Sequence, residues 1–425
     1  MKKVIIISYF YSPSNFVGAE RIVAWAENLN KNGIYPIIIT RNWNENQKDI
    51  VDEVLDNKLK IEKTENYEVH KLPYKQSLRD KCSKYSFLKY LQKFLSLYEL
   101  LMSNYFINAI PYNNIYYYTR ELLKSNSDIK IVIASGRPFQ LFSFGHHLKK
   151  EFKIFWIPDY RDEWTTHQNS EVSTGFIYKF LGRLEQKSEL KWTSNADYFI
   201  SVSENWVESI AKFISKKGFV VMNGFNKIDS LTNKTNAKSF RIVYAGTIYS
   251  SQRIELFIDS CILFNQQNNT QVKLEVVFIG TELNISVHNN LIQLTKDYNS
   301  LFSFLPRQTK AKLKDELEKA DLLLLTGFEN VKGWYPVKLF EYYASLKPIL
   351  LFPSDNDVME HFIRVTKSGY IINHQNECQE LFYKLINQKI KGEIIKLDID
   401  FEKGDFYSRA HQTDLLANFI NNIEN

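Results

Sequence analysis

Cysteine is scarce in this chain, and its scarcity excludes two kinds of structure. The 425 residues include only Cys82, Cys261 and Cys378. An odd number of widely separated cysteines gives neither a disulfide framework nor a zinc cluster. The simplest prediction is therefore a protein of a reducing, cytoplasmic compartment.

Long apolar runs and strong charge are missing as well. No stretch approaches the roughly 18 apolar residues needed to cross a bilayer. The apolar start of the chain is broken at Ser8 and Pro13 with no small-residue cleavage site after it, so it predicts a buried first strand and not a signal peptide. A net charge of only +6, without a basic helix-turn-helix or RNP-like signature, argues against nucleic-acid binding.

Hydrophobic residues, in contrast, are plentiful. They make up 44% of the chain, and aromatic residues alone make up 15%. This composition predicts a fully folded chain. Because single cores stop growing at roughly 250–300 residues, 425 residues predict two domains.

Strand and helix patterns alternate along the chain, which predicts mostly parallel sheets with helices on both faces. The strands expected are residues 4–9, 35–40, 241–244, 272–279, 322–326 and 348–352. The helices expected are residues 20–31, followed by Gly33, and four that begin at Ile254, Thr309, Pro336 and Asp357. The polar segment 225–240, rich in Asn, Ser and Thr, is the expected domain linker.

The most informative segment is residues 333–352. Pro336 suits the first turn of a helix, where its missing N–H costs nothing and free backbone amides attract phosphate. Lys338 and Glu341 then share a helix face, so a cation and an acceptor can meet a diphosphate and a ribose together. The alternative is an ordinary surface ion pair, which is common and weak.

This segment resembles the donor-site motif of glycosyltransferase family 4. Other segments resemble the same family in the same order over nearly the whole chain, and they are residues 3–13 followed by 18–21, 135–139, 159–164, 196–203, 223–226 and 244–249. The resemblance implies an α/β protein of GT-B fold, with two Rossmann-like domains whose parallel sheets face a central cleft. It implies an N-terminal acceptor-side domain over 1–222, a nucleotide-sugar domain over 223–405, and a C-terminal helix over 406–425 that crosses back to the first domain.

The resemblance also assigns donor residues. Lys338 and Arg253 would neutralise the departing diphosphate, since sugar transfer without metal needs cations and backbone dipoles there. Glu341 matches the second acid of the family's Glu-x7-Glu motif and would bind the ribose. Gly333 stands where the first acid is expected, so backbone groups or Glu329 must replace it. The remaining expected donor contacts are Gly18, Gly246, Thr247, Trp334 and, beside the base, Arg307.

Acceptor residues are expected in the segment 159–164, after a strand pattern at residues 154–157. Asp162 is the expected catalytic residue that orients or deprotonates the acceptor hydroxyl, with Asp159 and Arg161 binding the acceptor. An internal Arg–Asp network that braces the loop is an equal alternative. Gly18 would let the backbone approach a phosphate.

Two further patterns have competing interpretations. The Asp-x-Asp pairs at residues 355–357 and 398–400 formally match a metal-binding signature of another glycosyltransferase class. We interpret the first as a helix-capping turn and the second as a chance match near the C-terminus, away from any phosphate-binding glycine, and expect no metal and no cofactor. The basic segment 71–93 has seven cations against Asp80 and helically spaced aromatics, which suits an anionic membrane surface. An ordinary helix with a solvated basic face is the alternative.

The resemblance to family 4 implies a retaining, metal-independent glycosyltransferase, of hexosyl or N-acetylhexosaminyl type. Its donor would be a nucleotide diphosphate sugar, UDP-linked, and its acceptor a saccharide carried on polyprenyl diphosphate. Family habit places it in bacterial capsule or O-antigen synthesis, peripheral on the inner face of the plasma membrane. The alternatives are another GT-B chemistry, such as a UDP-sugar 2-epimerase, and a non-catalytic scaffold that binds the nucleotide sugar.

Overall fold

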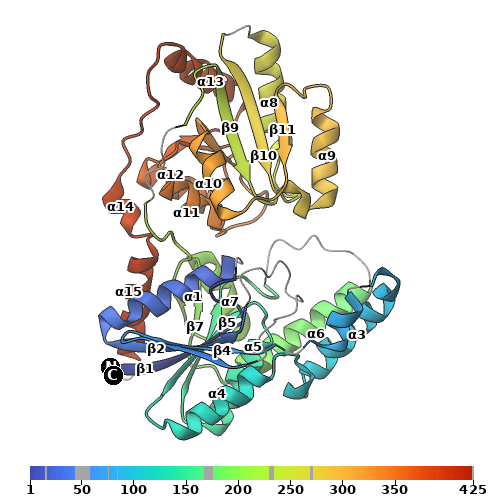
Figure 1. Ribbon diagram of the computed structural model, residues 1–425, viewed down its shortest axis with the longest axis vertical. Helices are drawn as coiled ribbons and strands as arrows, with labels where there is room; N and C mark the ends of the chain where they lie inside the picture. The colour runs from blue at the N-terminus through green and yellow to red at the C-terminus, as the bar shows by residue number, and fades with distance from the viewer. Residues whose placement is uncertain are drawn as a thin grey trace. The chain divides into compact units, whose positions relative to one another are not determined.

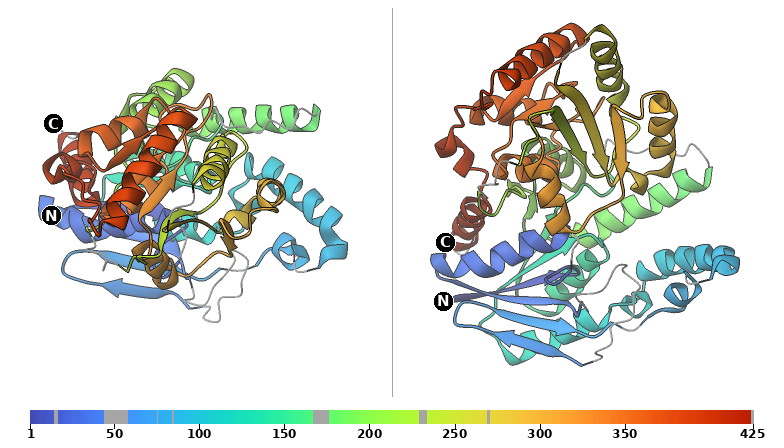
Figure 2. Two further views of the ribbon diagram at one scale, coloured as in Figure 1. Left: turned by 90° about the horizontal axis from the view of Figure 1, so that it is seen from above. Right: turned by 45° about the horizontal axis from the view of Figure 1, so that its top comes forward.

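The computed structural model describes residues 1–14, 17–43, 58–74, 76–83, 85–166, 176–228, 234–268 and 271–423. They form two compact units. Unit 1 contains Met1–Asn223 together with Arg409–Asn425, and unit 2 contains Gly224–Ser408. In Figure 1 and Figure 2, unit 1 runs from blue to green and includes the red helix α15 (Arg409–Asn422), while unit 2 covers the colours between.

Unit 1 is built on an eight-stranded sheet of order β3-β4-β2-β1-β5-β6-β7-β8. Its strands are β1 (Lys2–Ser8), β2 (Ile34–Arg41), β3 (Lys60–Lys63), β4 (Glu68–Leu72), β5 (Ile131–Gly136), β6 (Phe155–Tyr160), β7 (Phe199–Ser201) and β8 (Gly218–Val220). All neighbouring strands pair in parallel except β3 with β4. The parallel strands therefore end at one common edge, where α/β sheets bind ligands.

Helices cover both faces of this sheet. Figure 1 shows α1 and α15 on one face and α4 and α5 on the other. The helices of unit 1 are α1 (Val17–Asn28), α2 (Leu78–Ser83), α3 (Lys89–Ser103), α4 (Asn114–Ser125), α5 (Leu141–Glu151), α6 (Phe176–Thr193), α7 (Glu204–Ile214) and α15, with 3-10 turns η1 (Leu29–Asn32), η2 (Ser86–Leu88) and η3 (Ile107–Ala109).

The core of unit 1 follows from the alternation of side chains along β1. Val4 and Ile6 face a cluster that includes Trp25 of α1 and Leu416 of α15. Ile5 lies on the opposite face and is also fully buried. An apolar residue at every position is the pattern of a strand covered on both faces.

Unit 2 has a six-stranded parallel sheet of order β11-β10-β9-β12-β13-β14. Its strands are β9 (Ser239–Ala245), β10 (Lys273–Ile279), β11 (Phe302–Leu305), β12 (Leu322–Leu325), β13 (Ile349–Leu351) and β14 (Gly369–Ile371). Its helices are α8 (Ile254–Gln267), α9 (Ile285–Thr295), α10 (Lys310–Glu318), α11 (Val337–Ala344), α12 (Val358–Thr366), α13 (Gln375–Ile390) and α14 (Phe401–Asp405), with the 3-10 turn η4 (Thr281–Leu283).

The α/β class and the mostly parallel sheets agree with the sequence-based prediction, and the predicted strands lie within two residues of β1, β2, β9, β10, β12 and β13. Two predicted elements differ. Residues 71–93 do not form one amphipathic helix. Lys71 lies in β4, and α2, η2 and α3 follow as separate helical segments. In the predicted linker, residues 229–233 lie outside the described residues, and Ser239 and Phe240 already belong to β9.

Among the helices of the described residues, none combines the length and the apolar character that crossing a membrane requires.

Candidate functional site

The loop that follows β9 opens the candidate donor site in unit 2. Gly246 has a φ of +104° and donates its N–H to the Ile279 carbonyl at 2.7 Å. A side chain is disfavoured there, because L-residues rarely adopt this φ. A Cβ added to Gly246 would also lie 3.4 Å from the Lys338 Nζ atom. The backbone of this loop and the Lys338 amine are thus immediate neighbours.

Helix α11 carries Lys338 in its first turn. Pro336 is the N-cap residue, with a φ of −67°, and the helix begins at Val337. The Lys338 amine donates to the Tyr244 hydroxyl at 2.6 Å and to the Thr247 carbonyl at 3.3 Å. The hydroxyl of Tyr244 in turn donates to Thr247 O at 2.8 Å. These bonds hold a cation beside the amide groups that begin the helix, an arrangement suited to phosphate.

Burial lowers the pKa of Lys338 to about 7, while the negative charge of Glu341 acts in the opposite direction. Glu341 lies three residues further along α11 and is exposed. The two side chains therefore share a helix face, as the sequence spacing predicts. An amine with this pKa is partly neutral at pH 7 and would become charged when an anion binds.

Three aromatic rings lie beside this helix start. Trp334 stacks on Phe328 with 4.3 Å between ring centroids and 7° between planes, and Tyr249 lies 5.6 Å from Trp334. The loop containing Tyr249 is fastened to β12 by Gln252, whose amide donates to both the carbonyl and the hydroxyl of Thr326. Trp334 is partly exposed, so its ring is available to a ligand at this edge of the sheet.

Gly333 occupies the position where the family's Glu-x7-Glu motif has its first acid. Its φ is +73°, and its N–H donates to Asp357 Oδ2 at 2.5 Å. The alternative acid, Glu329, is exposed, and its backbone N–H donates to the Ser251 carbonyl. The turn around Gly333 is therefore held by a carboxylate that lies in one of the two Asp-x-Asp pairs.

Both Asp-x-Asp pairs have structural roles. Asp355 accepts hydrogen bonds from the backbone N–H groups of Met359 and Glu360 at the start of α12. Asp400 caps α14 by accepting from the Lys403 N–H, and Asp398 is exposed beside Lys367. Within the described parts of the chain, no three His, Cys, Asp or Glu side chains are grouped as metal ligands.

The two arginines predicted for the donor site follow strands of the same sheet. Arg253 precedes α8, is exposed, and makes no side-chain hydrogen bond or ion pair with another described residue. Arg307 comes two residues after β11, and its N–H donates to Glu282 Oε1 at 2.6 Å. A Cβ added to Gly280, after β10, would lie 3.6 Å from the Arg307 Cα. Both arginines thus lie at the carboxyl edge of the sheet, as Lys338 does through its contact with β9.

Asp159 of unit 1 does not have the expected character of an acceptor contact. It is fully buried, and its carboxylate accepts from Arg21 at 2.9 and 3.3 Å and from the Ser135 hydroxyl at 2.7 Å. Arg21 also donates to the carbonyls of Val221 and Met222. The expectation for Asp159 is corrected: it belongs to an internal network that joins α1, β5, β6 and the end of β8.

Arg161 and Asp162 lie closer to solvent. The guanidinium of Arg161 rests against Gly18, where an added Cβ would come within 1.4 Å of its Nη1 atom. Asp162 lies 3.6 Å from Arg161 and 3.8 Å from Arg137, and it is partly exposed. The space over Gly18 at the start of α1 is therefore occupied by an arginine of this chain. Burial lowers the pKa of Arg161, and the charges of Asp162 and Asp159 counteract this.

Several solved structures resemble the whole chain. Sucrose-phosphate synthase from Thermosynechococcus elongatus matches at a TM-score of 0.61 and 12% identity, covering 100% of this chain and 99% of that one. A trehalose-6-phosphate structure from E. coli bound with UDP-2-fluoro glucose matches at 0.59 and 12%, covering 99% of both chains. WaaG, a glycosyltransferase involved in lipopolysaccharide biosynthesis, matches at 0.53 and 11%, covering 99% and 100%. The chain has the GT-B fold. No family model and no curated protein matches the sequence.

Sequence reasoning missed two residues of this GT-B chain. Tyr244 is the direct partner of Lys338, yet the sequence pattern assigns it no role of its own. Arg21 is the partner of Asp159 and has no predicted role either. Tyr244 and Asp159 are polar residues near the ends of the buried strands β9 and β6. A buried polar group needs a partner from a neighbouring element, and this need was the signal in the sequence.

Proposed function

We propose that this chain is a retaining glycosyltransferase that moves a sugar from a nucleotide diphosphate sugar, UDP-linked, to a saccharide acceptor. The observation that carries the proposal is the Lys338 amine, held in the first turn of α11 beside the Gly246 backbone. Breaking the bond between sugar C1 and the diphosphate oxygen leaves negative charge on that oxygen. A cation and free helix amides at this position stabilise that charge.

The other residues of unit 2 take distinct roles in the proposal. Glu341 accepts hydrogen bonds from the ribose hydroxyls, Arg253 adds positive charge, and Arg307 lies beside the base. Trp334, stacked on Phe328, packs its ring against the sugar. This packing replaces the hydrogen bonds of the acid that is absent at Gly333. The backbone of Gly246 and Thr247 completes the diphosphate cradle, without a metal ion.

In unit 1 the proposal assigns the acceptor to the carboxyl edge of the sheet. Asp162 orients or deprotonates the acceptor hydroxyl, and Arg161 binds an acceptor phosphate. The finer assignment is a family 4 enzyme of hexosyl or N-acetylhexosaminyl type, with a lipid-linked saccharide acceptor of surface-polysaccharide synthesis. The likeness to WaaG, a glycosyltransferase involved in lipopolysaccharide biosynthesis, and to a structure bound with UDP-2-fluoro glucose supports this assignment.

Thermal stabilisation by a panel of nucleoside diphosphates and their sugar conjugates tests the donor site. A ligand at one hundred times its Kd adds about 2.7 kcal/mol to the free energy of unfolding. We expect UDP to stabilise the native chain, and Lys338→Met and Glu341→Gln each to abolish the shift. The matched controls are Glu380→Gln and Lys384→Met on α13, which change the same residue types in an exposed pair spaced by four residues. These α13 variants should keep the shift.

Four outcomes decide the proposal. A shift with UDP that is lost in the α11 variants and kept in the α13 variants supports it. No shift with any nucleotide in a folded sample contradicts it. Stabilisation by a UDP-sugar, without sugar transfer on incubation with membranes, would favour the non-catalytic scaffold, and turnover of the UDP-sugar without acceptor would favour an epimerase.

A further inference from the structure

Large apolar side chains are exposed over one continuous stretch of unit 1. Ten of them occur between Leu78 and Phe106, a stretch that includes α2, η2 and α3 and ends just before η3. Phe87, Tyr90, Phe94 and Tyr105 are 77, 85, 63 and 74% exposed. Such side chains stand out from the surface and do not lie flat on it. Six of the ten form what we call the aromatic face: Phe87, Tyr90, Phe94, Tyr98, Tyr105 and Phe106.

Helical geometry gathers part of this set on one side of α3. At 100° per residue, positions 90, 94, 97 and 98 fall within an arc of about 100°. A surface helix normally turns such a stripe toward the core. Here the stripe is exposed, so it is not the side by which α3 packs on unit 1.

Charge around the aromatic face has one sign. The exposed ionised side chains of the described residues 76–83 and 85–110 are Lys81, Lys89 and Lys93. The two acids of these ranges, Asp80 and Glu99, both pair with Arg79, at 3.2 and 3.0 Å. Across from η3, Lys191 of α6 lies 5.3 Å from the ring centre of Tyr105. Within residues 76–83 and 85–110, the surface therefore presents apolar rings and ammonium groups without an exposed carboxylate.

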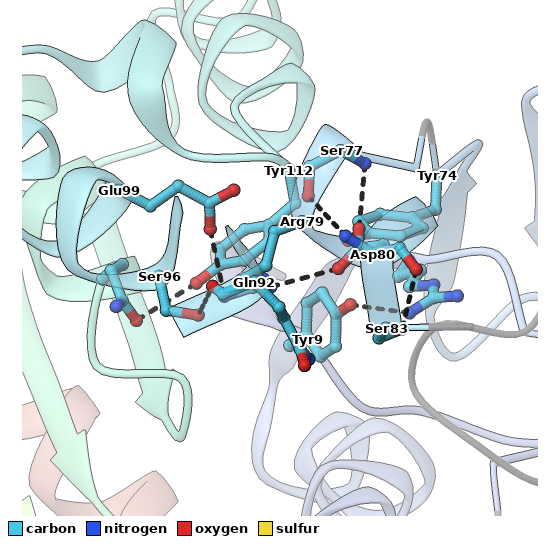
Figure 3. A network of polar contacts seen from close by, with 12 residues as sticks. Tyr9, Tyr74, Ser77, Arg79, Asp80, Ser83, Gln92, Ser96, Glu99 and Tyr112 are labelled. Atoms are coloured by element: carbon cyan, nitrogen blue, oxygen red, sulfur yellow. Dashed lines mark hydrogen bonds and ion pairs between the residues drawn. The ribbon is translucent and has the colours of Figure 1, made fainter. Parts of the chain in front are cut away.

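The aromatic face is fixed to the sheet by a polar network, shown in Figure 3. Arg79 joins α2 to Glu99 of α3, and Asp80 accepts from the Tyr74 hydroxyl at 2.5 Å and from the Ser77 N–H at 2.9 Å. Tyr74 lies two residues beyond β4, and its ring covers the guanidinium of Arg41 at the end of β2. The exposed helices are thus fastened to the carboxyl edge of the sheet.

We propose that the aromatic face docks on an anionic lipid surface, with its rings at the level of the headgroups and the three lysines on lipid phosphates. Tyrosine and phenylalanine beside lysine, on a helix that lies along the surface, suit the membrane interface. The absence of exposed carboxylates from these ranges matches the negative surface. The docking does not depend on the proposed transfer; only its use, to present a lipid-linked acceptor, rests on the proposed function.

The structure reduces the electrostatic contribution to membrane binding that the seven cations of the sequence indicate. Of the seven cations in segment 71–93, Lys71 is buried in β4 and paired with Glu62, and Arg79 is held by two acids. Lys75 and Lys84 lie outside the described residues. Apolar insertion therefore contributes more than the basic count alone indicates. Binding should weaken with salt yet persist at ~0.5 M, where surface charges are largely screened.

Vesicle flotation of the full chain tests this surface. One vesicle contains equal parts of phosphatidylcholine and phosphatidylglycerol, and the other contains phosphatidylcholine alone. We expect binding to the anionic vesicle, with about tenfold or greater loss of affinity in the triple variant Phe87→Ser, Tyr90→Ser, Phe94→Ser. The triple variant Lys81→Gln, Lys89→Gln, Lys93→Gln should lose about fivefold per lysine, on the anionic vesicle only.

Matched controls separate this surface from general stickiness. Ile285, Ile292 and Ile394 are exposed apolar residues of unit 2, and Lys296, Lys312 and Lys384 are exposed lysines of unit 2. Their Ser and Gln variants should bind vesicles as the unaltered chain does. The aromatic variant should keep its melting temperature and its stabilisation by UDP, which separates loss of docking from loss of the donor site.

Two results would overturn the proposal. One is unaltered vesicle binding by the aromatic variant. The other is no binding by the native chain to either vesicle; a dimer in solution that the aromatic variant dissociates would then assign this face to a second copy of the chain.

Discussion

The amine of Lys338 is bonded to the Tyr244 hydroxyl at 2.6 Å and also lies over the face of the same ring, 4.0 Å from its centroid. Its hydrogen-bond partners, this hydroxyl and the Thr247 carbonyl, are both uncharged. A phosphate oxygen is a stronger acceptor for an ammonium group than either of them. The arrangement therefore holds the amine in place while leaving its best partner to be supplied from outside.

Nucleotide binding should be coupled to protonation of Lys338. Its pKa of about 7 lies below the ordinary lysine value, so at pH 8 the amine is mostly neutral, and a bound diphosphate raises the pKa. We expect uptake of up to one proton at pH 8 and affinity that falls as pH rises above 7. Calorimetry in buffers of different ionisation enthalpy measures this uptake. Lys338→Met should abolish it, and the same uptake in that variant would assign the proton to another group.

Alanine at Gly246 should damage both the fold and the donor site. The φ of +104° costs a side chain about 1–3 kcal/mol, and the new Cβ would crowd the Lys338 amine. We expect a lower melting temperature and weaker UDP binding. Gly392→Ala is the matched control, since Gly392 has a φ of +74° with no neighbour within 4 Å. It should lower stability and leave UDP binding intact; equal loss of binding in both variants would count against the site.

Breaking the pair between Arg21 and Asp159 should destabilise unit 1 strongly. Both side chains are buried, so Asp159→Asn leaves the Arg21 charge without its counter-ion at a cost of about 3–5 kcal/mol. Urea unfolding measures the change. Lys124→Gln, which removes an exposed pair with Glu121, should leave the urea midpoint nearly unchanged. A similarly small change for Asp159→Asn would show that the buried pair is not needed for stability.

Glu189 should make stability fall as pH rises from about 4.5 to 7. Burial raises its pKa to about 7, against the opposing hydrogen bonds from Thr165. In that window the unfolded chain has released the proton and the native chain still binds it, so the slope of unfolding free energy with pH is negative. The full effect is up to about 3 kcal/mol. Comparing urea midpoints of the native chain and Glu189→Gln at pH 5 and pH 8 isolates it. Equal pH dependence in the two chains would contradict the assignment.

The sequence predicts much of the fold because buried parallel strands leave a simple pattern. The run from Val4 to Ile7 is apolar at every position, and all four residues are fully buried. The start of α11 was likewise predictable, since Pro336 ends extended backbone and begins a helix. These features depend on local residue types, which a single sequence displays.

The side-chain partners were harder to predict, because they come from distant parts of the chain. Lys338 reaches Tyr244, 94 positions away, and Arg21 reaches Asp159, 138 positions away. Their pairing depends on strand order, which no spacing in the sequence states. The burial of Lys71 and the double pairing of Arg79 had the same cause, and so the basic segment appeared more exposed than it is.

Unit 2 is, in its connections, an insertion into unit 1. The chain passes out of unit 1 after Asn223 and returns at Arg409, and the Arg409 guanidinium donates to the Asn223 carbonyl at 3.0 Å. The two ends that remain after deletion of unit 2 are therefore neighbours, and a short glycine linker can splice them. Unit 2 is a single continuous segment, so each unit can be designed as a separate chain, with one splice in unit 1 and none in unit 2.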